Sequence, residues 1–171
     1  MTLSPQFPDI TQRRIETNGI SLNVAEQGEG PLVLLLHGFP ESWYSWRHQF
    51  SALSDAGFHA VAPDMRGYGK SSIYKEHSAY TLREVVLDMR ELHSSISSEP
   101  VVWVGHDWGS PVVWSIARHH PELVAGLVSL CVPMGLEEGL SLDLIDRSVY
   151  PKKQFPVGQW DYMLFYMENF R

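Results

Sequence analysis

The sequence predicts an α/β fold in which a mostly parallel sheet carries helices on both faces. From residue 32 onward, short apolar segments alternate with segments of helical periodicity, and this order is typical of parallel sheets. The first apolar segment, Leu32–Leu36, is continuous, which indicates a strand covered on both faces. Polar, glycine-containing motifs follow these strands, where open α/β sheets build their sites.

The composition narrows the class of protein. The chain has 171 residues, of which 44% are hydrophobic and 19% charged, as in an ordinary globular protein. The net charge of -7 disfavours nucleic acid and anionic membranes as partners. We expect no signal peptide, because residues 1–14 lack an apolar region, and no membrane span, because the longest apolar run is too short. The lone Cys131 cannot form an internal disulfide, so a reducing cytoplasm is expected.

The N-terminal part predicts a lead-in followed by a hairpin. Residues 1–12 show little pattern and are expected to be loose. Residues 13–24 predict two short strands around a turn at Asn18-Gly19, because Asn-Gly between alternating residues is a strong hairpin signal. Residues 28–31 predict a loop rich in glycine.

The next segments predict helices and strands in alternation. Residues 43–53 place aromatic and aliphatic side chains on one face of a helix, and residues 58–62 predict a short strand that ends in a glycine-rich loop over 63–69. Thr81 is followed three residues later by Glu84, so a capping box should begin the next helix at Thr81. Residues 101–104 predict a strand, 109–120 a helix that ends before Pro121, and 123–132 one further strand.

Between the strand over 101–104 and its helix lies Gly105-His106-Asp107-Trp108-Gly109. This is the pattern of a nucleophile elbow, in which Gly-x-nucleophile-x-Gly forms a sharp strand-to-helix turn. We expect glycine at both ends because side chains would collide there and because glycine adopts strained φ and ψ most easily. The alternative interpretation of Asp107 is an ordinary helix N-cap. A carboxylate at this position predicts attack on an electrophilic carbon, which gives an ester that water must hydrolyse.

With His37-Gly38-Phe39-Pro40, Asp64-Met65-Arg66-Gly67-Tyr68-Gly69 and the elbow in view, the chain resembles the α/β-hydrolase superfamily. Within it, the resemblance is closest to the soluble epoxide hydrolases and covers the chain after about the first dozen residues. It implies a hydrolase core over 13–133, incomplete at its C-terminus, and the start of a helical cap over 134–171. It also implies a small apolar epoxide as substrate.

The resemblance assigns roles to individual residues. It implies that Asp107 is the nucleophile and that the backbone N–H groups of Phe39 and Trp108 form an oxyanion hole. A second interpretation of Trp108 is a core aromatic side chain. Tyr162, at the start of the cap, matches an acid that protonates the epoxide oxygen, although it also fits the buried face of a helix.

The neighbouring residues are expected to support the site rather than to react. The resemblance gives His37 and Asp64 the task of holding loops by hydrogen bonds, with Gly38 and Pro40 in the same motif. His106 precedes the nucleophile and is expected to be positioned beside it. No histidine has metal-site spacing with a second ligand, so neither a metal nor another cofactor is expected.

Two alternatives remain beside an epoxide hydrolase. One is a haloalkane dehalogenase, since these enzymes use Asp in a similar elbow, although they usually have Asn where this chain has Phe39, which favours the epoxide interpretation. Fluoroacetate dehalogenases usually have Arg where this chain has Trp108, which argues against them. The other alternative is an inactive hydrolase-fold domain that binds a small apolar ligand or a partner.

The resemblance places the catalytic His, its carboxylate partner and the second cap tyrosine after the cap start, and no residue here matches them. We therefore expect a truncated sequence, which a complementing chain or a homo-oligomer would repair. The same reasoning predicts a bare apolar sheet edge near 127–132.

Overall fold

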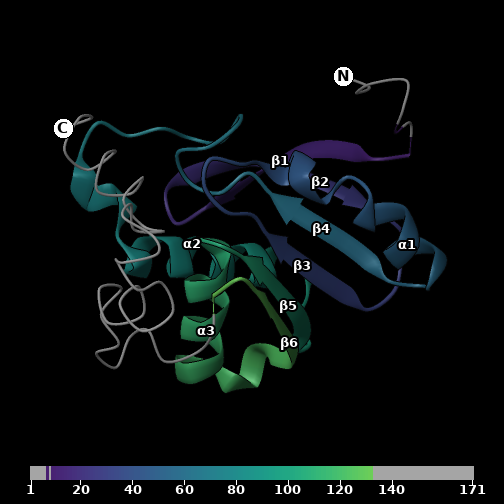
Figure 1. Ribbon diagram of the computed structural model, residues 1–171. Helices are drawn as coiled ribbons and strands as arrows, with labels where there is room; N and C mark the ends of the chain where they lie inside the picture. The colour runs from purple at the N-terminus through teal and green to yellow at the C-terminus, as the bar shows by residue number, and fades with distance from the viewer. Residues whose placement is uncertain (1–6, 8, 133–171) are drawn as a thin grey trace, which may run out of the picture. The chain divides into compact units, whose positions relative to one another are not determined.

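The structure is a computed structural model that describes residue 7 and residues 9–132. The chain divides into two units after Pro133, and all of the described residues belong to the first. The described elements are, in chain order, β1 (Thr11–Thr17), β2 (Ile20–Gln27), β3 (Leu32–Leu36), η1 (Trp43–Trp46), α1 (Gln49–Asp55), β4 (His59–Pro63), η2 (His77–Tyr80), α2 (Leu82–Ile96), β5 (Val101–His106), α3 (Gly109–His119), η3 (Pro121–Leu123) and β6 (Val124–Leu130) (Figure 1).

The described strands form one sheet in the order β1-β2-β4-β3-β5-β6. Strands β4, β3, β5 and β6 are parallel neighbours, while β1 and β2 run antiparallel at one end. The prediction of a parallel sheet from residue 32 onward is therefore confirmed. The hairpin is confirmed as well, and it extends the same sheet. Its turn residues Asn18 and Gly19 both have positive φ, as the tightest hairpin turns require.

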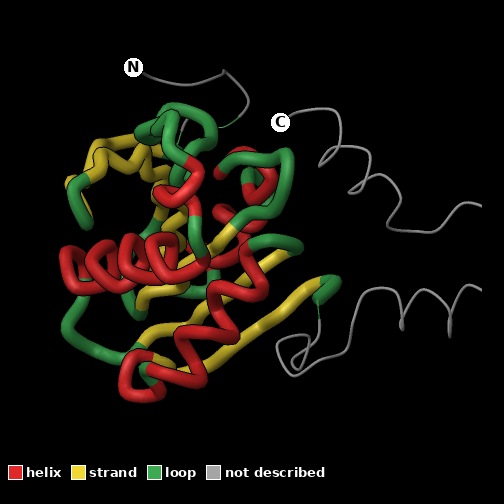
Figure 2. Tube along the Cα trace, turned by 90° about the vertical axis from the view of Figure 1, so that its left-hand side faces the viewer, coloured by secondary structure: helices red, strands yellow, loops and turns green. Residues whose placement is uncertain are grey.

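Two apolar cores lie on opposite faces of the sheet. Leu32, Leu34 and Leu36 of β3 belong to one core, together with residues of α2 and α3, and Val33 and Leu35 belong to the other, with residues of α1. All five side chains are buried, and their alternation is the period of two of a strand. Figure 2 shows helices lying across one face of the sheet. The prediction of helices on both faces is confirmed.

The prediction of a single helix over 43–53 is wrong. The structure divides this segment into the short 3-10 helix η1 and the α-helix α1. Trp43 and Trp46 are three residues apart and both are buried, a spacing that a 3-10 turn satisfies as well as an α-helix does. The hydroxyl of Ser42 accepts the N–H of Tyr44 and caps this tight turn. The apolar side chains were identified correctly, but the type of helix that carries them was not.

Helix α2 begins as predicted. The Oγ1 of Thr81 accepts the N–H of Glu84 at 3.4 Å, and Met89 and Leu92 are fully buried beneath the helix. The capping box is half formed among the described residues, since the Glu84 carboxylate turns instead toward Asn18 at 3.1 Å. Strands β4, β5 and β6 begin or end one or two residues from their predicted bounds, and η2 and η3 were not predicted.

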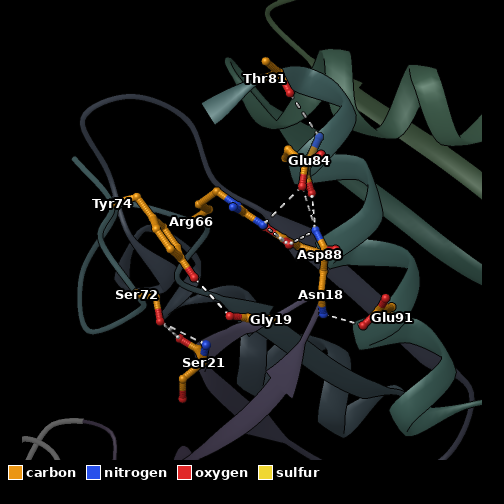
Figure 3. A network of polar contacts seen from close by, with 10 residues as sticks. All are labelled: Asn18, Gly19, Ser21, Arg66, Ser72, Tyr74, Thr81, Glu84, Asp88 and Glu91. Carbon is orange, nitrogen blue, oxygen red and sulfur yellow. Dashed lines mark hydrogen bonds and ion pairs between the residues drawn. The ribbon is translucent and has the colours of Figure 1, made fainter. Parts of the chain in front are cut away.

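A polar network joins the hairpin turn to α2 and to the loop after β4 (Figure 3). Asp88 is fully buried and accepts hydrogen bonds of 2.8 and 2.6 Å from the guanidinium of Arg66. The side-chain amide of Asn18 donates to Asp88 at 3.0 Å, and the N–H of Asn18 donates to the carboxylate of Glu91. Burial raises the pKa of Asp88 in spite of these partners, whereas the hydrogen bond to Asp88 raises the pKa of Arg66.

A second polar cluster lies across β1, β2 and β4. The carboxylate of Glu26 accepts bonds of 2.6 and 3.2 Å from Arg13 and lies 3.2 Å from Nε2 of His59. The His59 bond and the Arg13 interactions outweigh partial burial and lower the pKa of Glu26 to about 2. We call these three residues the Glu26 cluster.

Strand β6 is the last strand of the described sheet at the end opposite to β1. It pairs with β5 and with no other described strand, and its side chains Val128 and Leu130 are 45% and 41% exposed. An apolar edge was predicted in this region, and the described part of the chain has one.

Candidate active site

The candidate site lies at the C-terminal ends of the neighbouring parallel strands β4, β3 and β5 (Figure 1). Each strand leads directly into one of the predicted motifs: residues 37–40 after β3, 64–69 after β4 and 107–109 after β5. Because the carboxyl ends of parallel strands meet at one edge of a sheet, segments far apart in the sequence converge there.

Asp107 forms the sharp turn between β5 and α3. Its φ is +49°, a left-handed conformation that raises the energy of an L-residue by about 1–2 kcal/mol. Hydrogen bonds hold it there: its N–H donates to the carbonyl of Leu130 at 3.2 Å, and its carbonyl accepts the N–H of Ser110 at 3.0 Å. The side chain is half-buried. The strand–turn–helix context predicted for this residue is therefore present.

Glycine is required at both ends of the elbow because the backbone packs closely there, and not because the backbone adopts positive φ. A Cβ at Gly105 would lie 2.5 Å from the carbonyl oxygen of Gly109, and one at Gly109 would lie 2.3 Å from that of Leu36. Neither glycine has positive φ, so the expectation that they take up the strained φ and ψ is wrong. The strain is on Asp107, and the glycines let three backbone segments approach one another.

The loop after β3 brings a backbone donor to the carboxylate. The N–H of Phe39 donates to Oδ1 of Asp107 at 2.9 Å. A Cβ at Gly38 would lie 2.4 Å from the Cβ of Asp107, so only glycine permits this approach. The Phe39-Pro40 peptide bond is cis.

Trp108 follows Asp107 directly, and its side chain is 51% exposed. The second interpretation of this residue, as a core aromatic, is therefore wrong. Phe39 is 39% exposed, so two aromatic side chains next to the carboxylate, one in each loop, present apolar surface to solvent.

His37 is fully buried between the loops after β3 and β4. Its Nδ1 lies 2.8 Å from the carbonyl oxygen of Gly38, and its Nε2 accepts the N–H of Met65 at 2.9 Å. These partners require the proton on Nδ1 and use both ring nitrogens. Burial lowers the pKa of His37 although the Gly38 carbonyl opposes it. The imidazole joins two loops and offers no free nitrogen to the carboxylate.

Asp64 is buried and holds three segments together. Its Oδ1 accepts the N–H of Trp43 at 3.0 Å, and its Oδ2 accepts the side chain of Asn23 and the N–H of Lys70, each at 2.9 Å. A Cβ at Gly69 would lie 2.1 Å from Oδ2, so the loop closes over the carboxylate only with glycine there. With its oxygens so occupied, Asp64 fixes the loops around the site.

Sequence reasoning missed Glu41. Its Oε2 accepts the N–H of Gly38 at 3.1 Å and lies 3.2 Å from Nδ1 of His106, so it connects the loop after β3 to the residue before Asp107. Partial burial favours a higher pKa, but the bonds from Gly38 and His106 outweigh it and lower the pKa of Glu41. The available signal was an acid immediately after the His-Gly-Phe-Pro motif.

Tyr68 was also missed. Its ring packs edge-on against His37, with centroids 5.0 Å apart, and it is half-buried. Burial raises the pKa of Tyr68, and the negative charge of Asp107 raises it further. The available signal was a tyrosine flanked by two glycines in a loop after a strand.

The remaining expectations concern the cap, metal binding and membrane spans. Tyr162 and the predicted cap over 134–171 lie outside the described residues. Within 9–132, no group of three or more His, Cys, Asp or Glu side chains is arranged to hold a metal ion. None of the described helices is long and apolar enough to cross a membrane.

Comparisons with known proteins agree with this geometry. Residues 31–156 match the family of the alpha/beta hydrolase fold. Epoxide hydrolase A of Mycobacterium tuberculosis (strain ATCC 25618 / H37Rv) is 49% identical over 125 residues, which are 72% of this chain and 39% of that protein. Epoxide hydrolase B of the same strain is 54% identical over 105 residues, 61% of this chain and 30% of that protein. The chain thus spans well under half the length of these relatives.

Solved structures agree as well. The crystal structure of epoxide hydrolase VrEH1 from Vigna radiata matches with a TM-score of 0.76 and 44% identity, over 87% of this chain and 46% of that one. Epoxide hydrolase A from Mycobacterium thermoresistibile matches with a TM-score of 0.74 and 43% identity, over 82% and 44%. The elbow, the backbone donor beside it and these similarities together show that the chain belongs to the α/β-hydrolase superfamily and corresponds to the N-terminal portion of its epoxide hydrolase family.

Proposed function

We propose that the chain carries the nucleophile of an epoxide hydrolase and that Asp107 is that nucleophile. The observation that carries the proposal is the 2.9 Å hydrogen bond from the N–H of Phe39 to Oδ1 of Asp107, in a turn held at positive φ. Serine would attack an acyl carbon from such a turn, whereas a carboxylate attacks an alkyl carbon. The relatives named epoxide hydrolases support this choice of reaction.

The proposed reaction has two steps. An oxygen of Asp107 forms a bond to one ring carbon of the epoxide, the ring C–O bond breaks, and its electron pair goes to the epoxide oxygen. That oxygen takes a proton, for which Tyr162 is the proposed donor. Water then adds to the carbonyl carbon of the ester, and cleavage releases a diol and restores the carboxylate. This step also needs a base to activate water, a role we assign to no residue of this chain.

The oxyanion that forms when the ester is attacked requires preorganised donors. We assign this role to the backbone N–H groups of Phe39 and Trp108, each typically worth about 3–4 kcal/mol of transition-state stabilisation. The exposed rings of the same two residues favour an apolar substrate. A reducing compartment fits the free, exposed Cys131.

The test is covalent labelling of the 171-residue chain with an aryl epoxide such as styrene oxide. We expect one adduct by intact mass, located at Asp107 by peptide mapping. Asp107→Asn should abolish it, while Asp55→Asn, at an exposed position on α1, should leave it unchanged. A correctly folded chain that gives no adduct contradicts the proposal. Halide released from a chloroalkane without any epoxide adduct would favour a dehalogenase instead.

A further inference from the structure

The carbonyl of Leu130, at the end of β6, is a common acceptor for two groups of the elbow. The N–H of Asp107 donates to it at 3.2 Å, and the hydroxyl of Ser110 lies 3.0 Å from the same oxygen. Leu130 is also the strand partner of His106, the residue before the nucleophile. The end of β6 therefore bears directly on the turn that presents the carboxylate.

Ser110 closes this arrangement from the first turn of α3. It is fully buried, and its Oγ also lies 3.0 Å from the carbonyl oxygen of Gly105, the last glycine position before the turn. One hydroxyl hydrogen is thus shared between two carbonyls, one on each strand that flanks the elbow. Its own N–H donates to the carbonyl of Asp107 at 3.0 Å. Ser110 thus contacts the carbonyl of Gly105 through its hydroxyl and the carbonyl of Asp107 through its backbone N–H.

We propose that Ser110 is a positioning residue for Asp107, whose hydroxyl fixes the Leu130 and Gly105 carbonyls and thereby the direction of the nucleophilic carboxylate. This inference rests on the proposed function of Asp107. The physical reason is that φ of +49° persists only where surrounding bonds hold it. Without the hydroxyl, the Leu130 carbonyl keeps a single donor from the elbow, the one that Asp107 itself supplies.

The experiment compares rates of aryl epoxide labelling in Ser110→Ala and in wild type, over a range of epoxide concentrations. A displacement of the order of 1 Å at a reacting group lowers a rate by up to about 100-fold. We expect the maximal labelling rate to fall about 10- to 100-fold, while the half-saturating concentration stays within about twofold, because binding surface is not removed. Ser95→Ala is the matched control, since its hydroxyl donates to Leu92 at 2.7 Å on α2, away from the elbow.

The outcomes separate the two proposals. A folded wild-type chain that forms no adduct overturns the function proposed for Asp107. A wild-type chain that reacts at the same maximal rate as Ser110→Ala overturns the positioning role. Should Ser110→Ala not fold, Ser110→Cys fills nearly the same space with a weaker donor, and we expect a lower rate of labelling at Asp107. A Cys variant as fast as wild type would then overturn the inference.

Discussion

Replacing Asp88 by Asn tests how much the polar network between the hairpin turn and α2 contributes to the free energy of unfolding. The side chains of Asp88 and Arg66 are 0% and 4% exposed, so the neutral amide leaves a buried guanidinium with only the longer ion pair of 3.9 Å, among the described residues, to Glu84, whose side chain is 34% exposed. Breaking one partner of a buried pair typically lowers the free energy of unfolding by about 3–5 kcal/mol. Because each kcal/mol shifts Tm by about 2–4 °C in a protein of this size, Tm should fall by about 10 °C.

The measurement is urea and thermal unfolding followed by circular dichroism. Glu91→Gln is the control, because Glu91 belongs to the same network but is exposed and should change the free energy of unfolding by less than about 1 kcal/mol. Since burial raises the pKa of Asp88, desolvation outweighs its attraction to Arg66. Replacing both with apolar residues should therefore cost less than Asp88→Asn alone. A loss below 1 kcal/mol in Asp88→Asn would refute this reasoning.

Three further predictions follow from the fold and the site. The pKa of Glu26 is lowered from 4.5 to about 2, so the Glu26 cluster stabilises the fold above pH 4.5 and loses that contribution as pH falls toward 2. The pKa shift corresponds to a contribution of at most about 3 kcal/mol to the free energy of unfolding. We expect about 1–2 kcal/mol, because the partner Arg13 is half exposed. Glu26→Gln should therefore make the free energy of unfolding less dependent on pH below pH 4.5. Gly38→Ala should abolish epoxide labelling, since its Cβ would meet Asp107, while Gly126→Ala, where the new Cβ has ordinary contacts, should label normally by mass spectrometry. Val128→Lys should reduce self-association measured by light scattering, because a charge on an edge strand opposes edge pairing.

Each of these has a contrary result. Acid unfolding that is identical in Glu26→Gln and wild type contradicts the linkage. Labelling of folded Gly38→Ala at the wild-type rate would show that the loop after β3 moves away at little cost. Unchanged light scattering for Val128→Lys would mean that the exposed side of β6 does not drive association.

Much of the fold could be predicted because periodicity and end signals are local. The run Leu32–Leu36 alternates between two cores as a strand covered on both faces must, and Thr81 caps α2. The division of residues 43–53 could not be predicted, because residues three apart satisfy two kinds of helix. Neither could the path of the Glu84 side chain, which is drawn away from its own helix end by Asn18, a residue 66 positions distant.

The motifs of the candidate site could be predicted from the sequence, but the residues that hold these motifs in place could not. The elbow and the loop after β3 carry patterns that are visible in the sequence, so Asp107 and Phe39 could be expected to lie together. Glu41 contacts His106, 65 positions away in the sequence, and Ser110 contacts Leu130, 20 positions away. An acid directly after His-Gly-Phe-Pro is visible in the sequence, but its partner is not, and no local pattern marks Ser110. The location of backbone strain was also hidden, because glycine is the usual bearer of positive φ and here a carboxylate bears it.

The carbonyl of Leu130 connects β6, the last strand of the described sheet, to the turn that holds Asp107. A one-residue slip of this strand would exchange its two faces and would also remove the carbonyl that accepts the backbone N–H of Asp107. On the role proposed for Asp107, a change in how this last described strand pairs with β5 would change the reactivity of the carboxylate. On the same proposal, the pairing of β6 with β5 and the orientation of the Asp107 carboxylate both depend on the backbone oxygen of Leu130.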